Sequence, residues 1–201
     1  MKRRRILTIL NTLIVVFEII GIIHNISFNH RVALEYYTEQ SNILILISSI
    51  IFLYYLITNK KEPNWLKRLK YASVVSISIT FFVVLFILLP MSGFNIYGMF
   101  FDGTLFYHHL LCPLLSIISF IIFDEENNYS KKDSIYALTH TFIYGIVMVT
   151  LNILRIYNGP YPFLMVHNQT IIVSIMWVII IFLLAFLISN MIRVITSRRK
   201  K

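Results

Sequence analysis

Six apolar runs, each about as long as a bilayer is thick, constrain this chain more than any other feature. They cover residues 6–23, 36–57, 71–89, 105–123, 135–153 and 170–192. A helix needs about 20 residues to cross roughly 30 Å of hydrocarbon. Inside hydrocarbon the backbone must also satisfy its own hydrogen bonds, which a helix does. The pattern therefore predicts an all-α, polytopic integral membrane protein: one domain over residues 1–201, built as a single bundle of six transmembrane helices.

The composition agrees with this fold class and excludes several kinds of site. Hydrophobic residues make up 58% of the 201 residues and charged residues 13%, whereas about a quarter of the residues in soluble domains are charged. The single cysteine, Cys112, excludes a disulfide within the chain and a zinc site built on cysteine pairs. The six histidines lack the H-x-x-x-H spacing of a helical metal site. We therefore expect neither a metal nor another cofactor.

The basic residues predict the orientation of the bundle. Six spans place both ends of the chain on one side, and of the 18 Lys and Arg residues only Arg31 and Arg155 fall on the other side. Under the positive-inside rule the N- and C-termini are cytoplasmic. The net charge of +9 is then a topology signal. We expect the lipid bilayer as partner and no nucleic acid.

Polar residues gather at the predicted outer ends of the runs. The second run begins with the segment 36–42, YYTEQSN, and the fourth with His108 and His109, while Glu18 and Asn152 lie in the outer halves of the first and fifth runs. An unpaired imidazole or carboxylate in hydrocarbon costs several kcal/mol. We therefore expect these side chains to meet around a cavity among the first, second, fourth and fifth runs, open toward the outer leaflet.

Thr38 and His108 are the candidates for chemistry. Thr38 shares a helix face with Ser41 and Asn42, and a neighbouring histidine can deprotonate such hydroxyls. The alternative is that Thr38 or Ser41 caps the helix start. His108 has an alternative role too, as an imidazole that joins helices by hydrogen bonds. His140 lies near the inner end of the fifth run, and we expect it to be structural.

Three segments, in this order, resemble a known family. They are YYTEQSN (36–42), His108 followed by Pro113, and GPYPFL (159–164). Together they are similar to the androgen-induced and androgen-dependent membrane proteins that hydrolyse fatty acid esters of hydroxy fatty acids, and to the small six-helix bacterial relatives of those proteins. The resemblance implies Thr38 as nucleophile, His108 as its base and a place in a bacterial cell membrane. In the animal enzymes an asparagine-like residue lies closer to the threonine than Asn42 does here.

The function predicted from the sequence is therefore an intramembrane lipid-ester hydrolase. Thr38 would attack an ester carbonyl near the outer interface, and His108 would take its proton. Supporting roles are expected for Asn42 or Asn152 as oxyanion donors, Glu39 or Asp102 as the group that orients the histidine, Arg155 as the partner of a fatty carboxylate and Ser41 as reserve nucleophile. The alternative is a membrane protein that binds or transports a small molecule without hydrolysis, although interrupted helices in paired halves, typical of transporters, are few here.

Overall fold

The computed structural model describes residues 2–124 and 129–198, so residues 125–128 of the charged turn and the basic residues 199–201 lie outside the described part. The all-α prediction is confirmed, since the described residues form helices and no strand. Six helical stretches are long and apolar enough to cross a membrane, and each overlaps one of the six predicted runs: Lys2–Phe28, Tyr37–Ile57, Asn64–Met91, Phe106–Phe123, Lys131–Ile153 and Ile171–Ser197.

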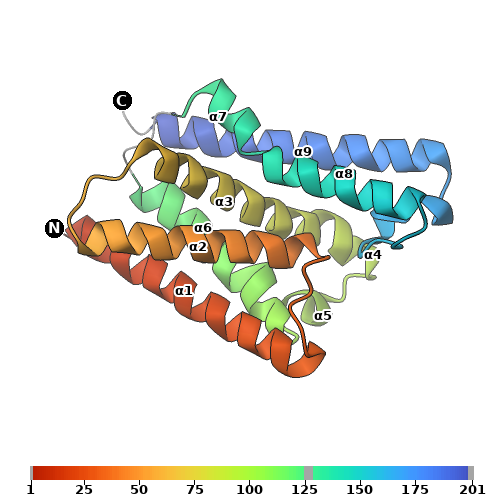
Figure 1. Cartoon of the computed structure of the whole chain (residues 1–201), viewed down its shortest axis with the longest axis horizontal. Coiled ribbons are helices and arrows are strands. Elements are labelled where there is room, and N and C mark those ends of the chain that lie inside the picture. Colours follow the sequence, from red (N-terminus) through yellow and green to blue (C-terminus); the bar gives the residue numbers. More distant parts are fainter. Residues whose placement is uncertain (1, 125–128, 199–201) are drawn as a thin grey trace.

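The helices follow the chain as α1 (Lys2–Asn29), α2 (Tyr37–Ile57), α3 (Asn64–Val83), α4 (Leu89–Met91), α5 (Ile96–Phe100), α6 (Cys112–Ile118), α7 (Lys131–Tyr136), α8 (Thr139–Ile153) and α9 (Ile171–Arg198). Three π-helical turns continue the spans, at Val84–Leu88, Phe106–Leu111 and Ser119–Phe123, and short 3-10 turns occupy Pro162–Leu164 and Val166–Asn168. The described chain begins at Lys2 and finishes at Arg198, and both lie at the same end of the bundle (Figure 1). We call this the terminal end, and the opposite end the distal end.

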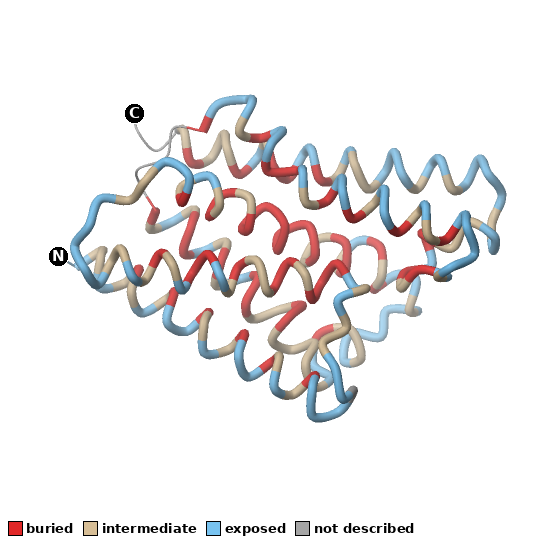
Figure 2. Tube along the Cα trace, viewed as in Figure 1, coloured by how far each residue is buried: buried red, intermediate tan, exposed pale blue. Residues whose placement is uncertain are grey.

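The third span is the centre of the bundle. It contacts α2, α6, α8 and α9, while α1 contacts α2 and α6, and burial is concentrated along it (Figure 2). Small hydroxyl residues let the helices approach closely and hydrogen-bond to one another. Ser73 bonds to Ser48 at 2.8 Å and Thr80 to Ser41 at 2.7 Å. Spans one to four thus form a compact unit, against which α8 and α9 pack on the α3 side.

A π-helical turn, Phe106–Leu111, opens the fourth span. Such a turn has i→i+5 hydrogen bonds and is wider than an α-helical one. His108 and His109 both lie within it, and both are buried in the interior, with 0% and 7% of their surface exposed. The two adjacent imidazoles face different neighbours, which determines the geometry of the site.

The fifth span is displaced toward the distal end. Residues 131–136 form the separate helix α7, so α8 starts level with the first turn of α2. There the His140 ring lies 3.1 Å from Gln40 Oε1 and 3.2 Å from Ser76 Oγ. The expected depth of His140, near the inner end of the span, is therefore wrong, although both ring nitrogens have partners as a structural role requires.

Candidate functional site

Thr38, in the first turn of α2, lies where three segments of the chain meet. Its Oγ1 is 3.4 Å from Nε2 of His109 and 3.3 Å from the hydroxyl of Tyr161. Its backbone N–H also donates to the Tyr161 hydroxyl, at 3.3 Å. Only 5% of Thr38 is exposed. The hydroxyl is thus held between an imidazole and a phenol, away from bulk water.

The tautomer of His109 follows from its other nitrogen. Nδ1 lies 2.8 Å from the backbone carbonyl of Met99, and a carbonyl only accepts, so Nδ1 carries the proton in the neutral ring. Nε2 then presents its lone pair to Thr38. At 3.4 Å this contact is longer than a strong hydrogen bond, as is common where the partners tighten only around a substrate. The geometry is that of a general base beside its hydroxyl.

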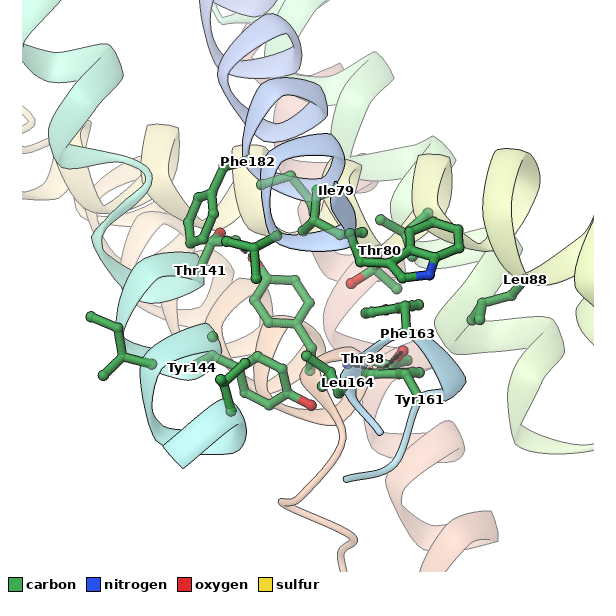
Figure 3. A pocket seen from close by; sticks show the side chains of 18 of the residues that line it. Thr38, Ile79, Thr80, Leu88, Thr141, Tyr144, Tyr161, Phe163, Leu164 and Phe182 are labelled. Carbon is green, nitrogen blue, oxygen red and sulfur yellow. Dashed lines mark hydrogen bonds between the residues drawn. The ribbon is translucent and has the colours of Figure 1, made fainter. Parts of the chain in front are cut away.

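Tyr161 is the second partner of Thr38 (Figure 3). Burial raises the pKa of its phenol to about 12, so the hydroxyl keeps its proton at neutral pH. Its oxygen accepts the Thr38 N–H, which leaves its own proton available for another acceptor. The ring stacks on Phe163 at 5.2 Å between centroids, and this contact fixes its direction. Tyr161 therefore supplies a protonated donor beside the Thr38 hydroxyl.

His108 lies in a separate environment between two carboxylates. Its Nδ1 is 3.0 Å from Oε1 of Glu39, and its Nε2 is 3.6 Å from Oε2 of Glu18. All three side chains are buried. The imidazole that the structure brings beside Thr38 is therefore His109, and the hydrogen bonds of the described residues include none between Thr38 and His108.

Ser41 and Asn42 support the start of α2. The Ser41 hydroxyl donates to the carbonyl of Thr38 at 2.9 Å and also contacts Thr80. The Asn42 amide donates to the carbonyls of Thr38 at 2.7 Å and His108 at 3.3 Å. Asn42 thus ties the second span to the π-helical turn of the fourth. Neither side chain points its donor toward the Thr38 hydroxyl.

Asn152 and Arg155 lie at the end of α8, beyond the site. Asn152 is buried, and its Oδ1 accepts the N–H of Val166 at 2.8 Å. This bond anchors the connector, which we define as residues 154–170 between α8 and α9 and which carries Tyr161. Arg155 is exposed and has a left-handed backbone, with φ +59°. Asn152 acts on the site only through the connector, and the structure gives Arg155 no contact with the cavity described next.

An apolar cavity of about 290 Å³ begins at Thr38 and Tyr161 (Figure 3). Most of its wall is hydrophobic and comes from α3, α8, α9 and the connector, for example Ile79, Val83, Val149, Leu164, Ile181 and Phe182. The expected location among the first, second, fourth and fifth runs is wrong, because the cavity lies among the second, third, fifth and sixth. The space between the first and fourth spans is filled by His108, which packs directly on Gly21.

Within residues 2–124 and 129–198 no group of three His, Cys, Asp or Glu side chains is placed to hold a metal ion. Comparisons of the chain with known protein families, with curated proteins and with solved structures find no match. Thr38, His109 and Tyr161 are therefore candidates because of their geometry and because of the three segments quoted from the sequence.

Sequence reasoning gave no role to His109 and Tyr161, the two residues that contact the Thr38 hydroxyl. Adjacent side chains point about 100° apart in an α-helix, so the sequence alone could not say which of His108 and His109 faces Thr38. The π-helical turn Phe106–Leu111 decides this in favour of His109. Tyr161 belongs to the quoted GPYPFL segment. A connector tyrosine between two prolines, Pro160 and Pro162, was the available sequence signal for a residue that folds back onto the helix ends.

Proposed function

We propose that this chain is an intramembrane lipid-ester hydrolase in which Thr38 is the nucleophile and His109 its general base. One observation carries the proposal: Oγ1 of Thr38 has a histidine lone pair at 3.4 Å, and the same residue lines the apolar cavity. A threonine hydroxyl is a poor nucleophile until a base takes its proton. The arrangement supplies that base on one side and room for an acyl chain on the other.

The reaction would proceed in two displacements. Thr38 Oγ1 attacks the ester carbonyl carbon as its proton moves to Nε2 of His109, and the carbonyl becomes an oxyanion. The Tyr161 hydroxyl donates a hydrogen bond to that oxyanion, a role for which its proton is available. The intermediate then expels the alcohol, which takes the proton from His109. Water, deprotonated by the same imidazole, cleaves the acyl-threonine and releases the carboxylic acid.

The proposal keeps Thr38 from the family resemblance and assigns the base to His109 instead of His108. His108 is hydrogen-bonded to Glu39 and packed on Gly21, with its ring fully buried. The cavity favours an ester with a long apolar acyl part, since most of its wall is hydrophobic and Thr38 and Tyr161 also line it. A volume of about 290 Å³ lies just below the roughly 300–1,000 Å³ typical of ligand pockets.

The test is ester hydrolysis by purified protein in nanodiscs, with a 4-nitrophenyl ester of a medium-chain fatty acid as probe. Thr38→Val and His109→Gln should each lower kcat by about 10²–10⁴-fold, and the double variant should be no worse than either. Ser41→Ala is the matched control and should retain activity. Full activity in Thr38→Val would overturn the nucleophile. A loss confined to His108→Gln, with His109→Gln active, would return the base to His108.

The cavity also supports a second candidate, which is binding of an apolar ligand without turnover. The wall of the cavity is predominantly hydrophobic, so it can hold an apolar ligand even if Thr38 does not react. A fluorescent fatty acid that binds wild type and is excluded by Gly145→Phe, combined with no ester hydrolysis by wild type, would favour this function.

A further inference from the structure

A cluster of buried ionisable side chains lies beside the proposed hydrolase residues without taking part in their chemistry. Glu18 of α1, Glu39 of α2 and His108 of the fourth span meet in the distal half of the bundle. Within the described chain, Oε2 of Glu39, Oδ1 of Asn42 and Nε2 of His108 have no hydrogen-bond partner. The Glu18 carboxyl group has the weak thiol donor of Cys112 beside it. These atoms are shielded from solvent, so each carries a desolvation cost.

Polar side chains continue from this cluster toward the terminal end. Cys112, one turn after His108, lies beside the Glu18 carboxyl group, and Ser116 and Ser119 follow on the next turns, both buried. Asn11 of α1 donates to Ser119 Oγ at 3.1 Å. A small hole of about 20 Å³ lies among Asn11, Ser48, Ser116, Ser119, Lys70 and Asp124. One water molecule needs about 10–15 Å³ and a few polar partners, so the hole fits one.

A second ionisable cluster closes the series at the terminal end. Lys70 is 2.9 Å from Glu62 Oε1 and forms a salt bridge with Asp124. Lys70 and Asp124 are buried. Asp124 also lines a wider hollow of about 400 Å³, together with Glu62, Arg4, Lys60 and Lys61. Asp124 thus borders both the small internal hole and the hollow at the terminal end.

Helix packing explains only part of this series. Serine and asparagine are ordinary hydrogen-bonding residues between membrane helices. Ionisable residues in a span are expensive, and they typically line ion pathways or proton relays. The interior of this bundle contains the ionisable side chains of Glu18, Glu39, His108, Lys70 and Asp124. Within the described residues, no three His, Cys, Asp or Glu side chains are placed to hold a metal ion. A single carboxylate or imidazole can bind a proton and release it, which is what a proton relay requires.

We propose that these residues form a proton pathway between the distal half and the terminal end of the bundle. Glu39 passes a proton to Nδ1 of His108, and the ring releases one from Nε2 to Glu18. Cys112, Ser116 and water in the small hole carry it on to Asp124. From His108 to Asp124 the fourth span rises roughly 24 Å at about 1.5 Å per residue, most of the roughly 30 Å hydrocarbon. Nothing is oxidised or consumed, and a pH gradient or membrane potential drives the transfer.

The pathway is tested by proton flux into liposomes that contain the purified protein and a trapped pH-sensitive dye. A potassium gradient with valinomycin sets the potential, at both signs. In liposomes with wild-type protein, the pH of the lumen should fall or rise, according to the sign of the potential, several-fold faster than in protein-free liposomes. Glu18→Gln and His108→Gln preserve side-chain size or polarity and should reduce the flux to the protein-free rate. Asn11→Leu, which fills the hole and leaves every ionisable residue of the pathway in the sequence, should do the same.

Thr38→Val is the matched control, because it removes the proposed nucleophile and leaves the pathway intact. Its flux should equal that of wild type, so loss of hydrolysis and loss of flux are separable. Size-exclusion profiles identify variants that fail to fold, and any one of the three pathway variants that folds suffices for the test. Wild-type flux equal to the protein-free rate, or unchanged flux in a folded pathway variant, would overturn the proposal.

Discussion

Gly21 of α1 leaves the space that the imidazole of His108 fills. A Cβ built at position 21 would lie 2.8 Å from Cδ2 of His108 and 3.2 Å from Cβ of Tyr107. Glycine in the middle of a helix is destabilising by about 1 kcal/mol relative to alanine. The close contact between the first and fourth spans is the compensating feature, and it fixes the imidazole between its two carboxylates.

Gly21→Ala should therefore destabilise the protein although alanine is the better helix former. Overpacking a filled interior costs about 1–3 kcal/mol, and the clash here is with a side chain buried on all sides. Thermal unfolding in detergent micelles measures the change. Gly145→Ala is the matched control, since a Cβ there would meet only the Phe182 ring, at 3.5 Å, and stability should hold or rise. A Gly21→Ala protein as stable as wild type would contradict the packing.

Tyr161→Phe should lower kcat of the proposed hydrolase by about 10²–10³-fold, the usual effect of removing one oxyanion donor. KM should change little, because the ring and its stack on Phe163 remain. Since the Tyr161 pKa is about 12, the phenol stays protonated and the deficit should be constant between pH 6 and pH 9. The control is Tyr36→Phe, whose ring meets Tyr161 edge-on. Equal kcat in wild type and Tyr161→Phe would remove the phenol from the mechanism.

The sequence predicted the fold because each span is a long apolar run, a signal that survives without knowledge of neighbours. It also predicted that Thr38, Glu39 and the two histidines share one depth, since residues at the same ends of the spans meet. The sequence did not predict how each helix is rotated about its own axis, which decides the neighbours that its side chains face. The π-helical turn Phe106–Leu111 directs His109 to Thr38 and His108 to Glu39, and apolar sequence contains no plain signal for such a turn.

The location of the cavity depends on how tightly neighbouring spans pack, which run lengths do not encode. Gly21 and the serines of α3 permit close approach in spans one to four. The wall on the other side of α3 is built from bulky side chains such as Trp177 and Phe182, and a cavity remains between them. His140 was misplaced for a related reason, because the separate helix α7 shifts the start of α8 by several residues.

Glu62→Gln should make the protein more stable at neutral pH and bring no gain in acid. Burial raises the pKa of Glu62 above its ordinary value of 4.5, although nearby Lys70 opposes the shift. Because the pKa of Glu62 is higher in the folded state than in the unfolded state, its carboxyl group contributes stability when it is protonated. That contribution is fully present below the unfolded-state pKa and is lost as the pH rises through the folded-state pKa. Glutamine avoids that loss. The difference in unfolding temperature between variant and wild type, measured from pH 4 to pH 8, should grow with pH, and a shrinking difference would contradict it.

The orientation of the bundle decides which leaflet supplies the substrate, and accessibility labelling tests it. In a Cys112→Ala background, Asn158→Cys at the distal end should react with a membrane-impermeant maleimide in intact cells. Lys61→Cys at the terminal end should react only after permeabilisation. Both positions are exposed, so failure to label reports the membrane barrier and not burial. The basic residues concentrated at the terminal end are the physical reason for this expectation. The reverse pattern would place Thr38 and the mouth of the site on the cytoplasmic side.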